Sequence, residues 1–249
     1  MANGVSLSNG RNWSSQKGAT EHFRQIRDRY ADRVPIDVEQ DHADLLSLLE
    51  RNDAAHGEKD SKIGVGVDFF EVRTNYGSGG PTRGFWVHRV DGTATDFSFP
   101  WAIRGIPKPQ SQEFTDTCRA SVNQELKAAK RRFFDRYADA AGLVPCELSG
   151  ALLSFETAHV DHAYPSFGAL VITFRAARGW HAAIPADTLT MPSDNQLTTT
   201  FVDPIVADTF KAFHRRAATL RIIAPGANLA RAAGQRHPKI ARPVLLGEQ

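Results

Sequence analysis

The sequence predicts an α+β protein built from two successive modules, for three reasons. Two segments early in the chain and one long segment near its middle carry apolar residues at helical spacing. Residues 62–99 alternate aromatic or β-branched residues with polar ones, as strands do. The stretch "IPKPQSQ" at residues 106–112 is rich in proline and polar residues, which is typical of a domain boundary. We therefore expect a small α+β module over residues 20–108 and a second domain over residues 113–249.

Composition places the chain among globular proteins. Of its 249 residues, 41% are hydrophobic and 23% are charged, and no apolar run is long enough to cross a bilayer. Residues 1–19 are rich in serine, glycine and asparagine and lack the apolar core of a secretory signal. We expect these residues to form a disordered leader, and the protein to be cytoplasmic with no membrane partner.

The first module is expected to begin with helices and continue with a hairpin. Thr20 is a candidate N-cap for the first helix. "GSGGP" at residues 77–81 is a hairpin loop between strand-like segments, and the Asp91-Gly92 pair marks a further turn. The expected elements are a helix over 20–33, a shorter helix over 41–52, and strands within 62–76 and 82–99.

The second module is expected to open with a long amphipathic helix that ends near Gly142. A hairpin-like unit with Gly150 near its turn follows, and Pro204 suits the first turn of a later helix. The expected elements are helices over 113–141, 166–179 and 203–220, a short strand over 220–224, and a final helix over 227–237.

Residues 158–162 read "AHVDH", a dense cluster in a chain that has nine histidines. Asp161 offers anionic oxygen, and His162 offers a side chain that titrates near neutrality. His159 is expected to share a strand face with Asp161, and a phosphate contact or a buried histidine is favoured over an extra metal ligand. The simpler interpretation of Asp161 and His162 is an exposed turn, because short motifs give false positives.

Two residues downstream complete a candidate site for phosphodiester hydrolysis. Asn228 and His237 are nine positions apart, at the two ends of the expected final helix. A divalent ion held by Asp161 and His237 can polarise a phosphate and neutralise charge on the leaving oxygen. His162 can then take a proton from an attacking water. A site with one oxygen ligand, one nitrogen ligand and open coordination positions is expected to bind Mg²⁺ or Mn²⁺. Zn²⁺ and Ni²⁺ are the further candidates.

"HVDH" followed by "LRIIAPGANLARAAGQRH" resembles the HNH nucleases, whose core is a ββα-metal fold. The resemblance spans residues 143–240 and implies that Asp161 and His237 bind metal, His162 is the general base and Asn228 braces the motif. About 65 residues separate His162 from Asn228, so the domain must contain a helical insertion. The paired structural cysteines of many such cores are absent, since the chain has two cysteines far apart.

"LLERNDAAHGEKDSKIGVGVDFFEVRTN" followed by "GFWVHRVDGTATDFSF" resembles the plant "defective chloroplasts and leaves" (DCL) family. The resemblance covers residues 23–108 and implies a small α+β module that binds nucleic acid or protein. Aromatic residues among basic ones suit base stacking with phosphate contact, although Trp86 on a strand could equally be core. The candidate contact residues are His56, Lys59, Lys62, Arg73, Arg83, Trp86, His88 and Arg89.

The last part of the chain is basic, although the net charge is only +2. From Ile205 to Gln249 there are eight lysines or arginines against two acids, which fits a polyanion partner. The alternative is a solvated surface. The expected nucleic-acid-binding residues are Arg215, Arg216, Arg231, Arg236 and Lys239.

These features predict a metal-dependent endonuclease that hydrolyses DNA, of the restriction or modification-dependent kind. DNA is expected ahead of RNA, and a homodimer is left open. The first alternative is a non-catalytic nucleic-acid-binding or RNA-processing factor built on the same folds. The second is an interaction module with a structural zinc held by Cys146, His159, Asp161 and His162.

Overall fold

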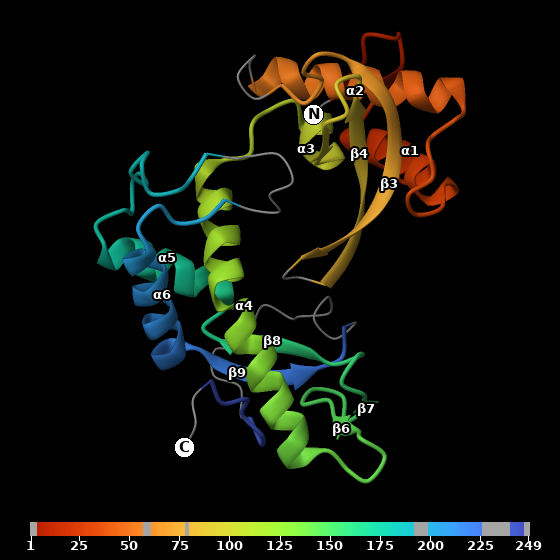
Figure 1. Ribbon diagram of the computed structural model, residues 1–249. Helices are drawn as coiled ribbons and strands as arrows, with labels where there is room; N and C mark the ends of the chain where they lie inside the picture. The colour runs from red at the N-terminus through yellow and green to blue at the C-terminus, as the bar shows by residue number, and fades with distance from the viewer. Residues whose placement is uncertain (1–3, 57–60, 78–79, 192–198, 226–239, 247–249) are drawn as a thin grey trace. The chain divides into compact units, whose positions relative to one another are not determined.

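The computed structural model describes residues 4–56, 61–77, 80–191, 199–225 and 240–246 (Figure 1). The chain divides into two compact units. The first unit runs to Pro109 and the second begins at Gln110. Each mixes helices with strands, so the α+β class is confirmed. The domain boundary expected at residues 106–112 coincides with the division between the units.

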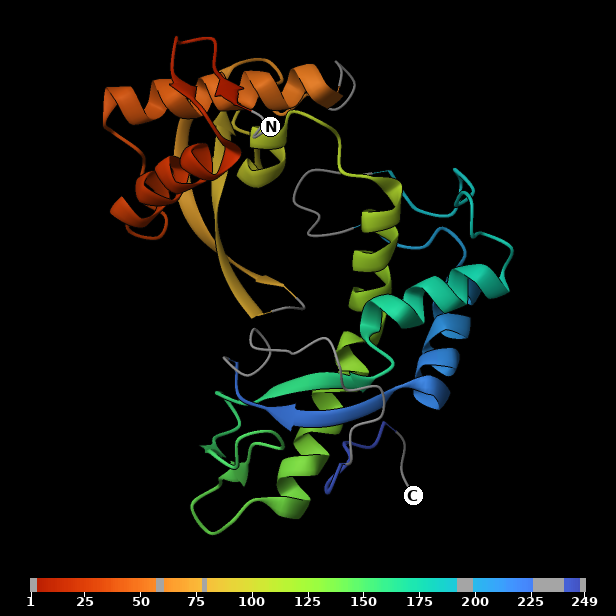
Figure 2. The ribbon, with the colours of Figure 1, turned by 180° about the vertical axis from the view of Figure 1, so that it is seen from behind.

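A three-stranded antiparallel sheet forms the centre of the first unit, with the order β3-β4-β5. Side chains alternate between its faces, and Phe70, Val72, Phe85 and Val87 are fully buried on one of them. Three helices pack on that face and share one hydrophobic core with it (Figure 2). The elements are α1 (Gln16–Arg29), α2 (Glu39–His56), β3 (Val67–Gly77), β4 (Gly80–Arg89), β5 (Ala94–Phe97) and α3 (Phe99–Arg104).

The N-terminal segment is ordered over residues 4–19, so the expected disordered leader is wrong there. Strands β1 (Val5–Ser6) and β2 (Asn12–Trp13) form a small hairpin. Its apolar residues are few, but Val5 and Leu7 are buried in the core of the unit and Trp13 packs against that core. Helix α1 begins earlier than expected, because the Ser15 side chain accepts a hydrogen bond from the Gly18 N–H and caps it in place of Thr20.

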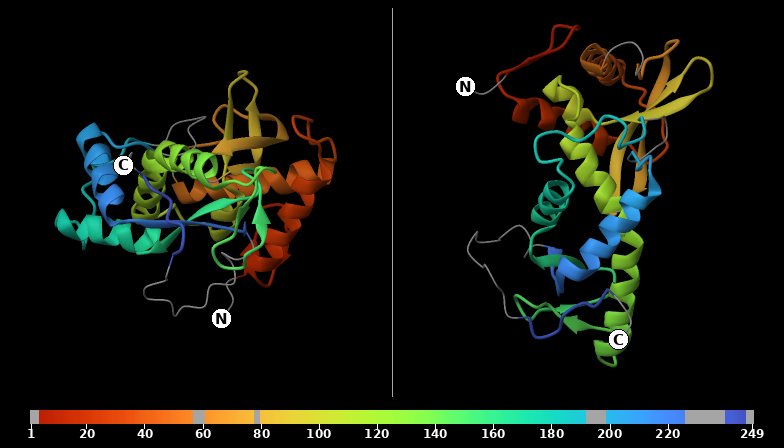
Figure 3. Two further views of the ribbon diagram at one scale, coloured as in Figure 1. Left: turned by 90° about the horizontal axis from the view of Figure 1, so that it is seen from below. Right: turned by 90° about the vertical axis from the view of Figure 1, so that its left-hand side faces the viewer.

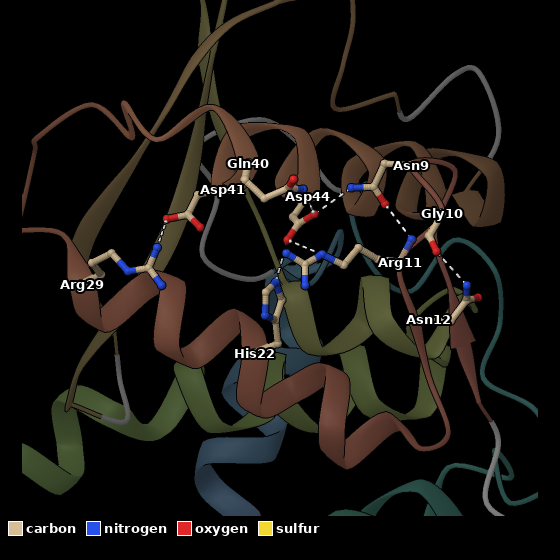
Figure 4. Close-up of polar contacts among 9 residues, drawn as sticks. All are labelled: Asn9, Gly10, Arg11, Asn12, His22, Arg29, Gln40, Asp41 and Asp44. Carbon is tan, nitrogen blue, oxygen red and sulfur yellow. Dashed lines mark hydrogen bonds and ion pairs between the residues drawn. The ribbon is translucent and has the colours of Figure 1, made fainter.

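A buried carboxylate ties this hairpin to the helices (Figure 4). Asp44 on α2 is fully buried. Its Oδ1 accepts hydrogen bonds from Asn9 Nδ2 at 2.7 Å and Gln40 Nε2 at 2.8 Å. Its Oδ2 lies 2.7 Å from His22 Nε2 and 3.3 Å from Arg11 Nε. A buried charge is tolerated when it is paired and hydrogen-bonded, and here the partners come from the hairpin, α1 and α2.

The second unit is built around one long helix, α4 (Figure 3). The later part of α4 packs Ala129 and Phe133 against strands, in a core that includes Ile222. The earlier part packs Phe114 and Val122 against two further helices. The elements are α4 (Gln110–Tyr137), β6 (Val144–Pro145), β7 (Leu152–Leu153), β8 (His159–Tyr164), α5 (Phe167–Ala177), α6 (Pro204–Ala217) and β9 (Thr219–Ile223).

Most expected elements of this unit are confirmed with small shifts. Ser166 and Asp203 cap α5 and α6 through their side chains, and β9 lies one residue from its expected position. Gly142 has a φ of +76° and forms the turn after α4, whereas the helix itself ends at Tyr137. The expected final helix over 227–237 lies outside the described residues.

Strand β8 pairs with β9 in an antiparallel sheet, although α5 and α6 lie between them in sequence. The long insertion therefore leaves at the end of β8 and returns directly to its partner strand. None of the helices within the described residues is both long and apolar enough to cross a membrane.

Candidate functional site

The expected catalytic cluster lies on β8, and its neighbours are set by the β8–β9 register. Asp161 is directly opposite Arg221, and His162 is opposite Leu220. Successive side chains of a strand point to opposite faces, so Asp161 and His162 face different surroundings. Asp161 is 5% exposed and His162 is 9% exposed, which contradicts the interpretation of the cluster as an exposed turn.

Asp161 forms a buried ion pair across the two strands. The Nε of Arg221 donates to Asp161 Oδ2 at 2.9 Å, and Arg221 is itself only 3% exposed. Removing one partner of such a pair leaves a buried charge without compensation, which is strongly destabilising. The carboxylate is a suitable hard ligand for a divalent cation, and the guanidinium beside it already balances part of its charge.

His162 contacts a second histidine on its own side of the strand. Its Nε2 lies 2.8 Å from the Nε2 of His214, on α6. Its ring also packs against the Phe167 ring in an edge-to-face arrangement, with 5.1 Å between the ring centroids. His214 is 0% exposed. Burial lowers the pKa of His214 to about 4, against the opposing influence of the Glu125 charge. The sequence around His214 is "FHRR", yet its side chain is completely buried although two arginines follow it.

The other half of the expected motif cannot be placed. Asn228 and His237 lie outside the described residues, as do Arg231, Arg236 and Lys239. The convergence of Asp161 and His237 on one metal ion therefore stays a prediction. Within the residues that are described, no three His, Cys, Asp or Glu side chains gather as candidate metal ligands.

The remaining expected contact residues of the second unit differ in how their charge is used. Arg215 donates to both carboxylate oxygens of Glu125, at 2.6 and 3.1 Å, so its charge is paired. Arg216 is exposed beside it on α6. His159 is exposed, so its interpretation as a buried histidine is wrong, and the phosphate contact stays a prediction.

Cys146, named for a structural zinc, packs into the core beneath β9. The Ala224 N–H donates to its Sγ at 3.3 Å. Burial raises the pKa of this thiol, but the Ser149 side chain and the Ala224, Ser149 and Leu148 backbone groups together hold it below its ordinary value. The turn after Cys146 thus supplies hydrogen bonds to its sulfur.

The first unit carries a polar and aromatic cluster on the sheet face opposite its core. The guanidinium of Arg73 lies over the Trp86 ring at 4.2 Å, and Trp86 Nε1 donates to Asn75 Oδ1 at 3.1 Å. The rings of Phe69 and His88 stack at 4.1 Å. Trp86 is half-buried on this outward face, so its assignment to the core is wrong.

The other contact candidates of this unit are less accessible or cannot be placed. Arg89 is buried, and its Nε donates to the Lys62 carbonyl at 3.1 Å. Lys62 donates to Thr95 Oγ1 at 3.0 Å, and Lys59 lies outside the described residues. Arg83 donates to the Tyr30 carbonyl, and His56 Nδ1 donates to the Asn52 carbonyl on its own helix.

Sequence reasoning missed two functional candidates, Arg221 and His214. Arg221 was counted within the basic end of the chain, and its place opposite Asp161 follows only from the strand register. His214 precedes two arginines in "FHRR", so the local composition does not reveal its burial. The signal available for His214 was its helical spacing from Phe210, which is buried on the same face of α6.

Comparisons with known proteins bear on the first unit. Residues 24–103 match a family described as "protein of unknown function (DUF3223)". The chain is also similar, at 30% identity, to an uncharacterised protein of Rhodospirillum rubrum whose structure was determined by NMR in solution. That similarity covers 41% of this chain and 90% of the other, with a TM-score of 0.34. The curated proteins contain no match to the chain.

Proposed function

We propose that the protein is a metal-dependent endonuclease that hydrolyses DNA phosphodiester bonds at the end of β8. The observation that carries this proposal is the direct pairing of β8 with β9. This pairing supports the expected ββα order, because the strand before Asn228 and His237 lies beside the strand that holds Asp161 and His162. The long insertion begins after β8 and ends before β9, and this placement is compatible with the HNH order.

The donor set fits a divalent cation. Asp161 supplies a carboxylate held by a cross-strand ion pair, and His237 is its proposed partner ligand. When bound, the ion would polarise the phosphate and stabilise negative charge on the leaving oxygen. Mg²⁺ and Mn²⁺ are proposed first, with Zn²⁺ and Ni²⁺ as further candidates.

His162 is proposed as the general base. It takes one proton from a water molecule, and the water oxygen forms a bond to phosphorus. The bond from phosphorus to the 3′ oxygen breaks, and its electron pair stays on that oxygen, which then takes a proton from solvent. Burial beneath α5 and α6 orients the imidazole before the substrate arrives.

Recognition of DNA is proposed to involve both units. The exposed Arg216, with Arg231, Arg236 and Lys239, is proposed to contact phosphates, whereas Arg215 is partly neutralised by Glu125. The outward cluster around Trp86 is the proposed contact surface of the DCL-like first unit.

A nicking assay tests the proposal. Supercoiled plasmid incubated with the protein and Mg²⁺ or Mn²⁺ should be converted to open-circular or linear DNA, and His162→Ala should abolish this conversion. His181→Ala is the matched control, because His181 is exposed outside the cluster. Equal cleavage by His162→Ala and wild type would remove the nuclease assignment.

A second candidate is a nucleic-acid-binding protein that does not cut. The ion pair between Arg221 and Asp161 favours it, because the carboxylate is compensated there without a cation. This candidate predicts DNA or RNA binding that weakens steeply with salt, and no strand cleavage with any of the four metals.

A further inference from the structure

His214 lies on α6, in the segment inserted between β8 and β9, and it contacts the proposed general base. Its Nε2 is 2.8 Å from the Nε2 of His162. The two rings are 5.1 Å apart between centroids, and their planes are inclined by 65°. The contact is tertiary, since 52 residues of sequence separate the two histidines. The insertion therefore contributes a side chain to the site.

The contact with His214 engages Nε2 of His162. A neutral imidazole has one N–H donor and one acceptor nitrogen, and the bond to His214 uses Nε2. In the proposed reaction, Nδ1 is the nitrogen through which His162 takes a proton. An imidazole that holds this proton donates from both nitrogens, so its Nε2–H must donate to a lone pair on His214 Nε2.

The surroundings of His214 suit an acceptor that keeps no charge of its own. The centroids of the Phe167 and Phe210 rings lie 6.3 and 6.1 Å from the centroid of the His214 ring, and the His214 side chain is completely buried. The low pKa that follows from burial keeps its ring neutral beside a protonated neighbour. Within the described part of the chain its Nδ1 has no hydrogen-bond partner. An apolar residue would fill this space without leaving that atom unsatisfied, so packing alone does not account for a histidine.

We propose that His214 is the positioning residue of His162: it accepts the hydrogen bond from His162 Nε2–H and so fixes the orientation and tautomer that present Nδ1 to the attacking water. The assignment rests on the nuclease function proposed above, because His214 acts through the proposed base. The proton taken from water stays on His162, and His214 neither gains nor loses a proton in the step.

Two substitutions of similar size separate hydrogen bonding from packing. His214→Gln keeps an acceptor near the position of Nε2, whereas His214→Met fills similar space without one. We expect His214→Met to lower kcat for plasmid nicking by about a hundredfold, the cost typical of a misplaced catalytic group, with KM for DNA within about twofold of wild type. His214→Gln should recover at least about tenfold of that loss. Equal kcat in wild type and His214→Met overturns the proposal.

Nitrogen-15 NMR of the imidazole rings supplies a readout that does not depend on cleavage. At neutral pH we expect His162 to carry its hydrogen on Nε2 in wild type, and to lose this single tautomer in His214→Met. A wild-type His162 that carries its hydrogen on Nδ1 overturns the proposal. If wild type shows the expected tautomer but cleaves no DNA, the nuclease function fails while the positioning contact stands, so the two failures are distinguishable.

Discussion

His214 is a neutral imidazole that the fold keeps away from water, and this makes the stability of the second unit depend on pH. Its folded pKa of about 4 lies below its ordinary value of 6.5. Between these values the unfolded chain binds the proton and the folded protein does not. The contribution of His214 is therefore fully present above pH 6.5 and is lost as the pH falls toward 4.

We expect this titration to lower the free energy of unfolding by about 3 kcal/mol between pH 7 and pH 4. Urea unfolding of wild type and His214→Gln at several pH values measures it, because only wild type has the titrating ring at this position. Charges that influence it include Glu125, and His162 is its direct neighbour, so the comparison is made with both intact. Parallel pH profiles for the two proteins would contradict the expectation.

In the proposed site, the Arg221 guanidinium and a divalent metal ion interact with the same carboxylate, that of Asp161. The stability of Arg221 variants with and without metal therefore tests whether Asp161 binds the ion. Arg221→Met should destabilise the protein by about 3–5 kcal/mol, because it removes the cross-strand cation that faces the buried Asp161 carboxylate. If Asp161 is a metal ligand, Mn²⁺ should restore part of this loss, by about 2.7 kcal/mol at a hundred times its Kd. Thermal unfolding with and without Mn²⁺ tests this.

The control for that experiment is the double substitution of Asp161→Leu with Arg221→Met. It removes both charges, so it should be close to wild type in stability and should not respond to Mn²⁺. A Mn²⁺ effect of the same size in the double variant would show that the ion acts at another place.

At the scale of elements, the N-terminal hairpin depends on one buried acid. Polar residues dominate its sequence, yet Asp44 on α2 bonds to Asn9 and Arg11 and so fixes it to the helices. The segment resembles a leader because its own apolar residues are few. Asp44 lies more than thirty positions from Asn9, so local composition does not reveal this contact.

We expect Asp44→Asn to loosen the hairpin, because the amide cannot accept all the hydrogen bonds and has no charge for Arg11 and His22. Amide hydrogen exchange of residues 5–13 should become at least about tenfold faster, which corresponds to about 1.4 kcal/mol of lost local stability. Asp37→Asn is the control, since Asp37 is exposed. Unchanged exchange in Asp44→Asn would show that the apolar contacts of Val5 and Leu7 suffice.

At the scale of the whole molecule, each unit has its own hydrophobic core. Among the described residues, the core of the first unit draws only on residues before Pro109, and the two clusters of the second unit draw only on later ones. A domain with its own core can in principle fold alone. A protein that ends at Pro109 should therefore unfold cooperatively by circular dichroism, with the dispersed amide spectrum of a folded domain.

Much of the fold was predictable because it depends on local patterns of apolar and polar residues. The alternation of Phe70, Val72, Phe85 and Val87 predicted the sheet, and helical spacing predicted α4, α5 and α6 within a few residues. Helix ends were less predictable, since α1 begins at a cap that uses Ser15 rather than Thr20. Which of two nearby polar residues caps a helix depends on the path of the chain before it.

By itself, the sequence determined the α+β class, the division near Pro109 and the cluster of Asp161 and His162 on a strand. Only the tertiary structure decided that Arg221 pairs with Asp161, that His214 bonds to His162 and that Trp86 faces away from the core. The physical reason is the sequence separation of the residues that interact. Periodicity and turn chemistry act between residues a few positions apart, whereas strand register and helix packing join residues 50 or more positions apart, such as His162 and His214 at a separation of 52.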